Sequence, residues 1–121
     1  MIERYSRKEI KAIWDDYNKY SLWLEIELAA AEAMEKFKII PKGISKKIRS
    51  RAKVNVKRIL QIEDKVKHDV IAFLTSIAEK AGNDARHLHK GMTSSDVLDT
   101  CFNLQLKQSG EILLKDIDQL L

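Results

Sequence analysis

One stretch of the chain gathers most of the residues that could do chemistry. From His87 to Thr100 the sequence reads His-Leu-His-Lys-Gly-Met-Thr-Ser-Ser-Asp-Val-Leu-Asp-Thr. Imidazoles can move protons, and Gly91 can let a ligand approach the backbone closely. An apolar helical pattern begins directly afterwards, so the hydroxyls would stand at a helix N-terminus, where free N–H groups and the dipole attract a carboxylate or phosphate. The stretch therefore indicates an anion-binding helix start.

The same stretch also suits a purely structural role. Thr93, Ser94 and Ser95 are all good N-cap residues. Asp96 and Asp99 follow where acidic side chains stabilise a first helical turn. From local chemistry alone, a well-capped helix start is the simpler interpretation.

Two shorter groups combine charge with an aromatic or imidazole ring. Lys67, His68 and Asp69 fall at a predicted helix junction, a setting that suits a ligand-binding or proton-handling imidazole. Arg4 and Tyr5 form a predicted exposed pair in which the guanidinium could hold a phosphate and the ring could stack on a base. The alternative for His68 is a surface histidine at a helix cap. The alternative for Arg4 and Tyr5 is an ordinary frayed terminus.

The elements that must position these groups are predicted to be helices. Four glycines and one proline in 121 residues leave few interruptions, and apolar residues recur at helical spacing. Ser6 and Asp69 are the expected N-caps of two of these helices. The helix at 18–38 is apolar over most of its circumference and should be largely buried. The pattern predicts helices over about 6–14, 18–38, 45–52, 56–66, 69–81 and 97–121, which makes residues 1–121 one all-α domain.

Composition narrows the class of protein. The net charge of +4 permits an anionic ligand without requiring nucleic acid, because basic and acidic residues are mixed along the chain. Cys101 is the only cysteine, so neither a disulfide framework nor a Cys-based metal site is expected. His87 and His89 lack further ligands and are weak evidence for a metal. With no signal peptide and no apolar run long enough to span a bilayer, we expect a cytoplasmic protein with no membrane or nucleic-acid partner.

Three motifs together resemble the N-terminal domain of the adenylosuccinate lyase family, in the fumarase/aspartase superfamily. They are Met-Ile-Glu-Arg-Tyr-Ser at 1–6, Lys-His-Asp-Val at 67–70 and His-Lys-Gly-Met-Thr-Ser-Ser-Asp-Val-Leu-Asp-Thr at 89–100. The last motif alone points only to the superfamily, whereas the first two point to this branch. The resemblance implies an all-helical homotetramer that needs no metal or organic cofactor. It also implies elimination of fumarate from adenylosuccinate, giving AMP, and from SAICAR, giving AICAR, in purine biosynthesis.

The resemblance also implies a role for each motif. The implied substrate-binding residues are Arg4, Tyr5, Lys67, His68, Asp69, Thr93 and Ser94. The first pair should hold the nucleotide, the middle three should line the same site, and the two hydroxyls should bind a carboxylate of the succinyl group. His68 and His89 should support catalysis. Many bacterial members carry arginine where this chain has Lys67, which puts a bidentate contact there in doubt.

The family's general-acid histidine and general-base serine have no counterpart within residues 1–121. Elimination needs both, while donors around the carboxylate stabilise the developing carbanion. The central bundle helices are also absent, and the apolar pattern is still running at Leu121. We therefore expect a domain truncated before the bundle and inactive alone. The alternatives are another superfamily lyase, such as an argininosuccinate type, or a non-catalytic helical interaction module.

Overall fold

Six α-helices and two 3-10 turns make up the computed structural model, which describes residues 2–121. The elements are η1 (Glu3–Tyr5), α1 (Lys8–Ile13), α2 (Asp16–Lys36), α3 (Ile44–Arg51), α4 (Val56–Val66), α5 (Asp69–Ala81), η2 (Gly82–His87) and α6 (Ser94–Leu120). Nothing in residues 2–121 forms a strand. The all-α fold predicted from the spacing of apolar residues is confirmed, and so are the bounds of the helix at 56–66.

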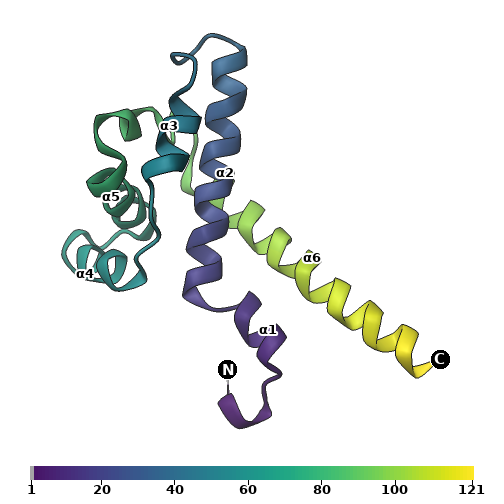
Figure 1. Ribbon diagram of the computed structural model, residues 1–121. Helices are drawn as coiled ribbons and strands as arrows, with labels where there is room; N and C mark the ends of the chain where they lie inside the picture. Colours follow the sequence, from purple (N-terminus) through teal and green to yellow (C-terminus); the bar gives the residue numbers. More distant parts are fainter. Residues whose placement is uncertain (1) are drawn as a thin grey trace.

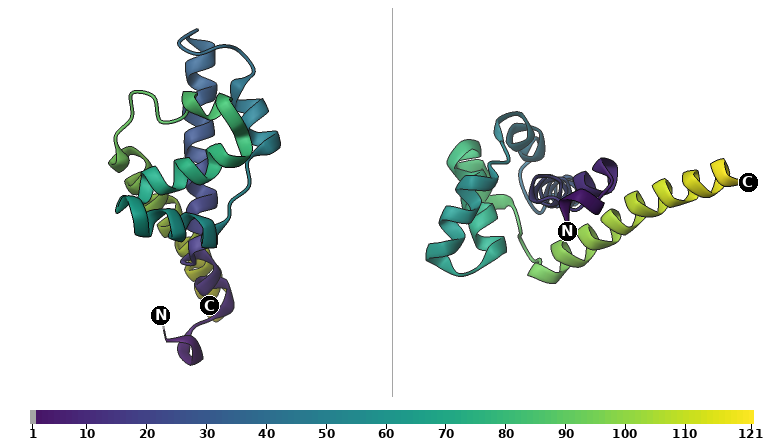
Figure 2. Two further views of the ribbon diagram at one scale, coloured as in Figure 1. Left: turned by 90° about the vertical axis from the view of Figure 1, so that its left-hand side faces the viewer. Right: turned by 90° about the horizontal axis from the view of Figure 1, so that it is seen from below.

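The central helix is α2, which contacts α1, α3, α4 and α6 and which the other helices flank on two sides (Figure 1). On one side lie α3, α4 and α5, with α4 and α5 packed against each other. On the other side α6 crosses α2, contacts α1, and then projects away from the remaining helices (Figure 2). The loop after η2 carries the chain from the first group of helices to the start of α6, beside α2.

The core forms around a cluster of aromatic rings. Tyr20 and Trp23 on α2 meet edge to face with ring centroids 5.1 Å apart, and Phe73 on α5 lies 6.0 Å from Tyr20 and 5.5 Å from Trp23. All three side chains are buried. Their burial joins α2 to α5, because aromatic side chains contribute large apolar areas and favour such offset and edge-to-face contacts.

Burial along α2 is confined to one face, which corrects the expectation of a largely buried helix. Leu28 and Ala31 face the core, whereas Ala29 and Ala33 are exposed. Phe37, just after the helix, is 78% exposed. The alanines made the sequence read as apolar all round, but small side chains are also tolerated on an exposed helix face.

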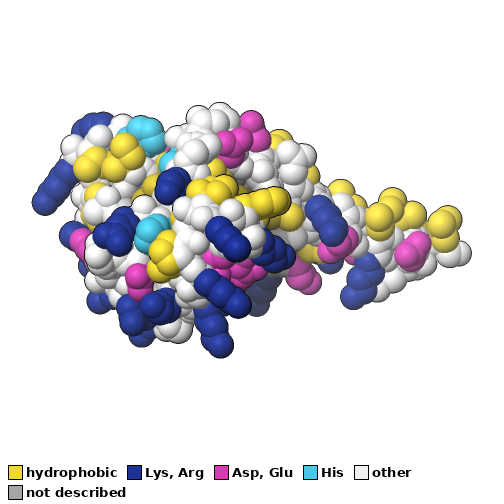
Figure 3. All heavy atoms as spheres, turned by 90° about the horizontal axis from the view of Figure 1, so that it is seen from above, with side chains coloured by type: hydrophobic (Ala, Val, Ile, Leu, Met, Phe, Trp, Pro, Cys, Tyr) yellow, Lys and Arg dark blue, Asp and Glu magenta, His cyan; other side chains and the backbone are white. Residues whose placement is uncertain are grey.

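The buried face of α6 carries Val97, Cys101 and Gln105. The apolar stripe predicted along the same helix is mostly exposed to solvent. Its exposed members are Phe102, Leu106, Leu113, Ile117 and Leu120. Figure 3 shows apolar side chains along the projecting part of this helix. The helix thus packs into this domain through one face and presents a second apolar face to solvent.

The start of α1 differs from its prediction. The N-cap is Arg7, which makes no side-chain cap hydrogen bond, and Ser6 is not the cap. The Ser6 hydroxyl instead donates to the carbonyl of Ile2 at 2.6 Å. A serine can satisfy the turn before it as readily as the helix after it, and here it closes η1.

None of the helices described for residues 2–121 has both the length and the hydropathy needed to cross a membrane.

Candidate functional site

The start of α6 has the geometry expected of a capped helix terminus. Thr93 is the N-cap in extended conformation, and Ser94 is the first helical residue. A carboxylate oxygen of Asp96 accepts the N–H of Thr93 at 2.8 Å. Gly91 adopts a φ of 69°, so the tight turn before the helix requires its left-handed conformation. The chain therefore delivers two neighbouring hydroxyls, Thr93 and Ser94, to the positive end of a long helix.

His89 is held beside this helix start by a buried carboxylate that the sequence analysis missed. Its ring Nδ1 lies 2.6 Å from Oε1 of Glu27, and its backbone N–H donates to Oε2 of the same side chain at 2.7 Å. The Glu27 side chain is 0% exposed and that of His89 is 21% exposed. Glu27 is one of four glutamates in α2, and nothing in the sequence distinguishes it from the exposed Glu25 and Glu32.

His68, and not Asp69, is the N-cap of α5, which corrects the prediction. Nδ1 of His68 accepts the N–H of Ile71 at 3.3 Å. The Asp69 carboxylate instead accepts the N–H of Val70 at 2.7 Å. Both side chains remain partly exposed at the helix junction, so the structure keeps them accessible to a ligand.

Lys67 closes the preceding helix in the left-handed conformation, with a φ of 53°. Its ammonium lies 2.9 Å from a carboxylate oxygen of Asp64, and both side chains are exposed. An exposed pair of this kind is weak and exchanges readily with water. The lysine is therefore free to turn toward an anion.

Arg4 and Tyr5 form the predicted exposed pair in η1. The guanidinium carbon of Arg4 lies 4.9 Å from the centroid of the Tyr5 ring, a cation–π arrangement. Figure 1 places η1 below α1, away from the α4–α5 pair and from the start of α6. The three predicted groups are therefore accessible, but the Arg4–Tyr5 pair is not brought together with the other two within residues 2–121.

Two other kinds of chemistry, thiol reactivity and metal binding, play no part in these groups. Burial raises the pKa of the Cys101 thiol, which keeps it protonated and unreactive. Within the described part of the chain, no group of three or more His, Cys, Asp or Glu side chains is placed to hold a metal ion.

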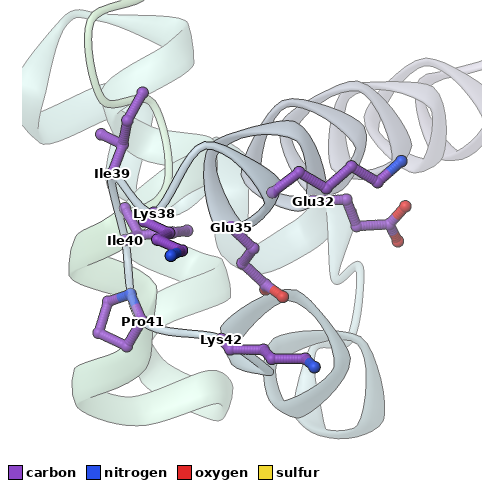
Figure 4. A pocket seen from close by; sticks show the side chains of 8 residues that line it. Glu32, Glu35, Lys38, Ile39, Ile40, Pro41 and Lys42 are labelled. Carbon is purple, nitrogen blue, oxygen red and sulfur yellow. The ribbon is translucent and has the colours of Figure 1, made fainter.

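A cavity of about 910 Å³ opens at the turn between α2 and α3 (Figure 4). The residues that line it are Glu32, Glu35, Lys36, Lys38, Ile39, Ile40, Pro41 and Lys42. None of the predicted site residues is among them. The carboxylate of Glu35 is occupied by the backbone N–H groups of Gly43 and Ser45, at 2.9 and 2.6 Å, so it serves the turn.

Comparison with known proteins identifies the family. A family model described as lyase matches residues 3–121. Adenylosuccinate lyase of Bacillus subtilis (strain 168) is 45% identical over 119 residues, which cover 98% of this chain and 28% of that protein. The chain thus spans less than a third of the length of this relative.

A solved structure shares the fold. The fumarate lyase from Mesorhizobium sp. BNC1 superposes with a TM-score of 0.84 over 93% of this chain and 27% of its own, at 21% sequence identity. At that identity the likeness speaks for the arrangement of the helices alone. Since the family model covers nearly all of its residues, the chain belongs to the lyase family, and within that family its sequence is similar to adenylosuccinate lyase.

Proposed function

We propose that residues 1–121 form the substrate-binding N-terminal domain of an adenylosuccinate lyase. The reaction is elimination of fumarate from adenylosuccinate, giving AMP, and from SAICAR, giving AICAR. The observation that carries the proposal is the start of α6, where Thr93 and Ser94 stand at the positive end of the helix and His89 is anchored beside them. The 45% identity to the Bacillus subtilis relative supports the choice of substrate.

The chemistry assigned to this domain is charge stabilisation. Removal of a proton next to a carboxylate leaves negative charge that hydrogen-bond donors must stabilise as it develops. Thr93 and Ser94 supply hydroxyl donors, and the unpaired backbone N–H groups of the first helical turn add to them. His68 and His89 have supporting roles, while the principal acid and base are contributed from outside residues 1–121.

The separation of the Arg4–Tyr5 pair from the other two motifs supports a site shared between copies of the protein. We infer that Arg4 and Tyr5 from one chain, and residues 67–69 or 93–94 from others, meet in a homotetramer. The apolar stripe of α6 offers a face for such assembly, because contiguous exposed apolar surface marks interaction sites. Closed symmetric assembly is the usual outcome for soluble enzymes of one chain type.

The test is to assay the complete protein that contains residues 1–121 for fumarate release, with adenylosuccinate, SAICAR and argininosuccinate as competing substrates. Turnover of the first two without the third is the expected result. Turnover of argininosuccinate alone would assign the protein to a different lyase branch. The 121-residue chain by itself is expected to release no fumarate, and measurable turnover by it would place an acid and a base among its own histidines.

A further inference from the structure

Among residues 2–121, Glu27 is the only acidic residue with a buried side chain, and it occupies the middle of α2. Both of its carboxylate oxygens are used by one residue, His89, which lies 62 positions further along the chain. A carboxylate without water is costly unless it is paired and hydrogen-bonded. The Glu27 carboxylate could therefore not be buried without its contact with His89, and this contact in turn fixes the position of His89.

The backbone at His89 supports the same conclusion. Its φ of 60° lies in the left-handed region, which non-glycine residues rarely adopt. Such a conformation persists when surrounding contacts hold it in place. The hydrogen bond from the His89 N–H to Oε2 of Glu27, at 2.7 Å, is such a contact. Glu27 thus anchors the main chain and the ring of His89 together, immediately before the turn that leads into α6.

The contact also determines which ring nitrogen of His89 is free. A carboxylate can only accept, so Nδ1 of His89 must carry the proton that lies between it and Oε1 of Glu27. In the neutral ring, Nε2 then keeps its lone pair and acts as an acceptor. His68 has the opposite arrangement, because its Nδ1 accepts the N–H of Ile71 and its proton must lie on Nε2.

We propose that Glu27 is a positioning residue, which fixes His89 with Nδ1 protonated and presents Nε2 to the substrate beside the start of α6. This inference rests on the proposed lyase function for its catalytic consequence. Its structural half, the ring tautomer, can be measured without any substrate. For histidines that bind a metal, loss of the partner that fixes ring orientation and tautomer typically costs on the order of 10- to 100-fold in affinity or activity, and we expect a loss of similar size here.

The first experiment reads the tautomer directly. Two-dimensional NMR that correlates ring carbon-bound protons with ¹⁵N distinguishes protonated from bare ring nitrogens, and we would record it on the 121-residue chain in alkaline buffer. His89 is expected to be protonated at Nδ1 and His68 at Nε2. In Glu27→Gln, which keeps the size of the side chain, His89 should lose its strong preference. Glu32→Gln on the same helix, an exposed position, is the matched control and should leave the spectrum of His89 unchanged.

The second experiment tests the catalytic consequence in the complete protein. Glu27→Gln should lower kcat by about 10-fold or more, with a much smaller change in KM. Glu27 acts through His89, so in a His89→Asn background the same substitution should cost no further activity. Asparagine suits this background because it tolerates the left-handed conformation and can still donate to Glu27.

The outcomes distinguish failure of the positioning role of Glu27 from failure of the proposed lyase function. A wild-type His89 that carries its proton on Nε2 overturns the positioning role, whether or not the Glu27→Gln variant folds. An equal loss of activity from Glu27→Gln with and without His89 also overturns it, because the effect would then be general. Absence of lyase turnover in the wild-type protein overturns the proposed function instead, and the NMR result still decides whether Glu27 fixes the ring.

Discussion

Gln105 on α6 donates its side-chain amide to the carbonyl oxygen of Ile13 at 2.9 Å, and Asn18 on α2 donates to the same oxygen at 2.7 Å. Ile13 is the last residue of α1, so its carbonyl has no partner within its own helix. Two amides from two different helices therefore close the break between α1 and α2. This contact fixes the direction of α6 relative to the N-terminal part of the chain.

The buried amide of Gln105 gives the first prediction. Gln105→Leu removes one donor to Ile13 while Asn18 still satisfies the carbonyl, so the free energy of unfolding should fall by about 1 kcal/mol. Urea denaturation followed by tryptophan fluorescence measures the change. Gln61→Leu, at an exposed position of α4, is the control and should have almost no effect. Equal stability of the two variants would show that the bond across α1 and α6 is unimportant.

The aromatic cluster gives a second and larger effect. Phe73 is fully buried against Tyr20 and Trp23, and Phe73→Ala should cost about 3–5 kcal/mol of unfolding free energy. A loss of that size can unfold a small domain, so Phe73→Leu serves as a milder companion. Phe37→Ala, which truncates the exposed phenylalanine after α2, is the matched control. In thermal unfolding, the melting temperature should be lowest for Phe73→Ala, intermediate for Phe73→Leu and highest for Phe37→Ala. Similar melting temperatures would contradict the assigned core.

Acid should weaken the turn between α2 and α3. Backbone N–H groups, chiefly that of Ser45 and then that of Gly43, hold the pKa of Glu35 below its ordinary value of 4.5. A lowered pKa in the folded state means that the ionised form stabilises the fold above the ordinary pKa. That stabilisation is lost as the pH falls through the lowered value.

Glu35→Gln tests this pH dependence. The variant should be less stable than the wild type at neutral pH, by about 1 kcal/mol, since its amide is a weaker acceptor for these N–H groups. The difference should shrink as the pH falls below about 4.5. Glu32→Gln should show no such trend, since its side chain is exposed. Chemical denaturation over a pH series supplies the measurement, and a constant gap at all pH values would refute the role given to Glu35.

The hydroxyls at the start of α6 are the most direct test of the binding site. In the complete protein, Thr93→Ala with Ser94→Ala should reduce kcat/KM by an amount equivalent to about 2–4 kcal/mol for each lost contact to the developing charge. The matched control is Ser50→Ala with Thr75→Ala, two hydroxyls that bond carbonyls of their own helices. Wild-type kinetics in the Thr93→Ala, Ser94→Ala variant would show that both hydroxyls serve only to cap the helix.

Self-association is the expected behaviour of the 121-residue chain. Leu113, Leu114 and Ile117 are all more than half exposed on the projecting part of α6, and Leu120 is 86% exposed. Sedimentation should show a mass that increases with concentration, because contiguous apolar surface favours association. Replacing Leu113 and Ile117 with glutamine should abolish the increase, whereas Lys115→Gln should not. A strictly monomeric wild-type chain at high concentration would contradict this.

The helices were predictable because each depends on local periodicity, and the predicted bounds of α4 agree with the structure. The caps were less predictable, since neighbouring polar residues such as His68 and Asp69 compete for the same backbone groups. Local pattern also could not choose between the two faces of α6, because the buried one carries Gln105 and the open one carries leucines. Glu27 was missed for a related reason: its partner is distant in the sequence, and burial of a charge becomes visible only in the folded chain.

The projection of α6 has a dynamic consequence. Its first turns are covered by α2 and α1. Beyond them, Ser109 accepts the indole N–H of Trp14 at 3.1 Å, and Asp116 pairs with Arg7. Beyond that point the helix has few neighbours to oppose fraying. Amide hydrogens near Val97 and Cys101 should exchange with solvent only when the whole domain opens, while those approaching Leu120 should exchange through local openings. One continuous helix would then show two lifetimes, and docking of a partner on its open face would lengthen the shorter one.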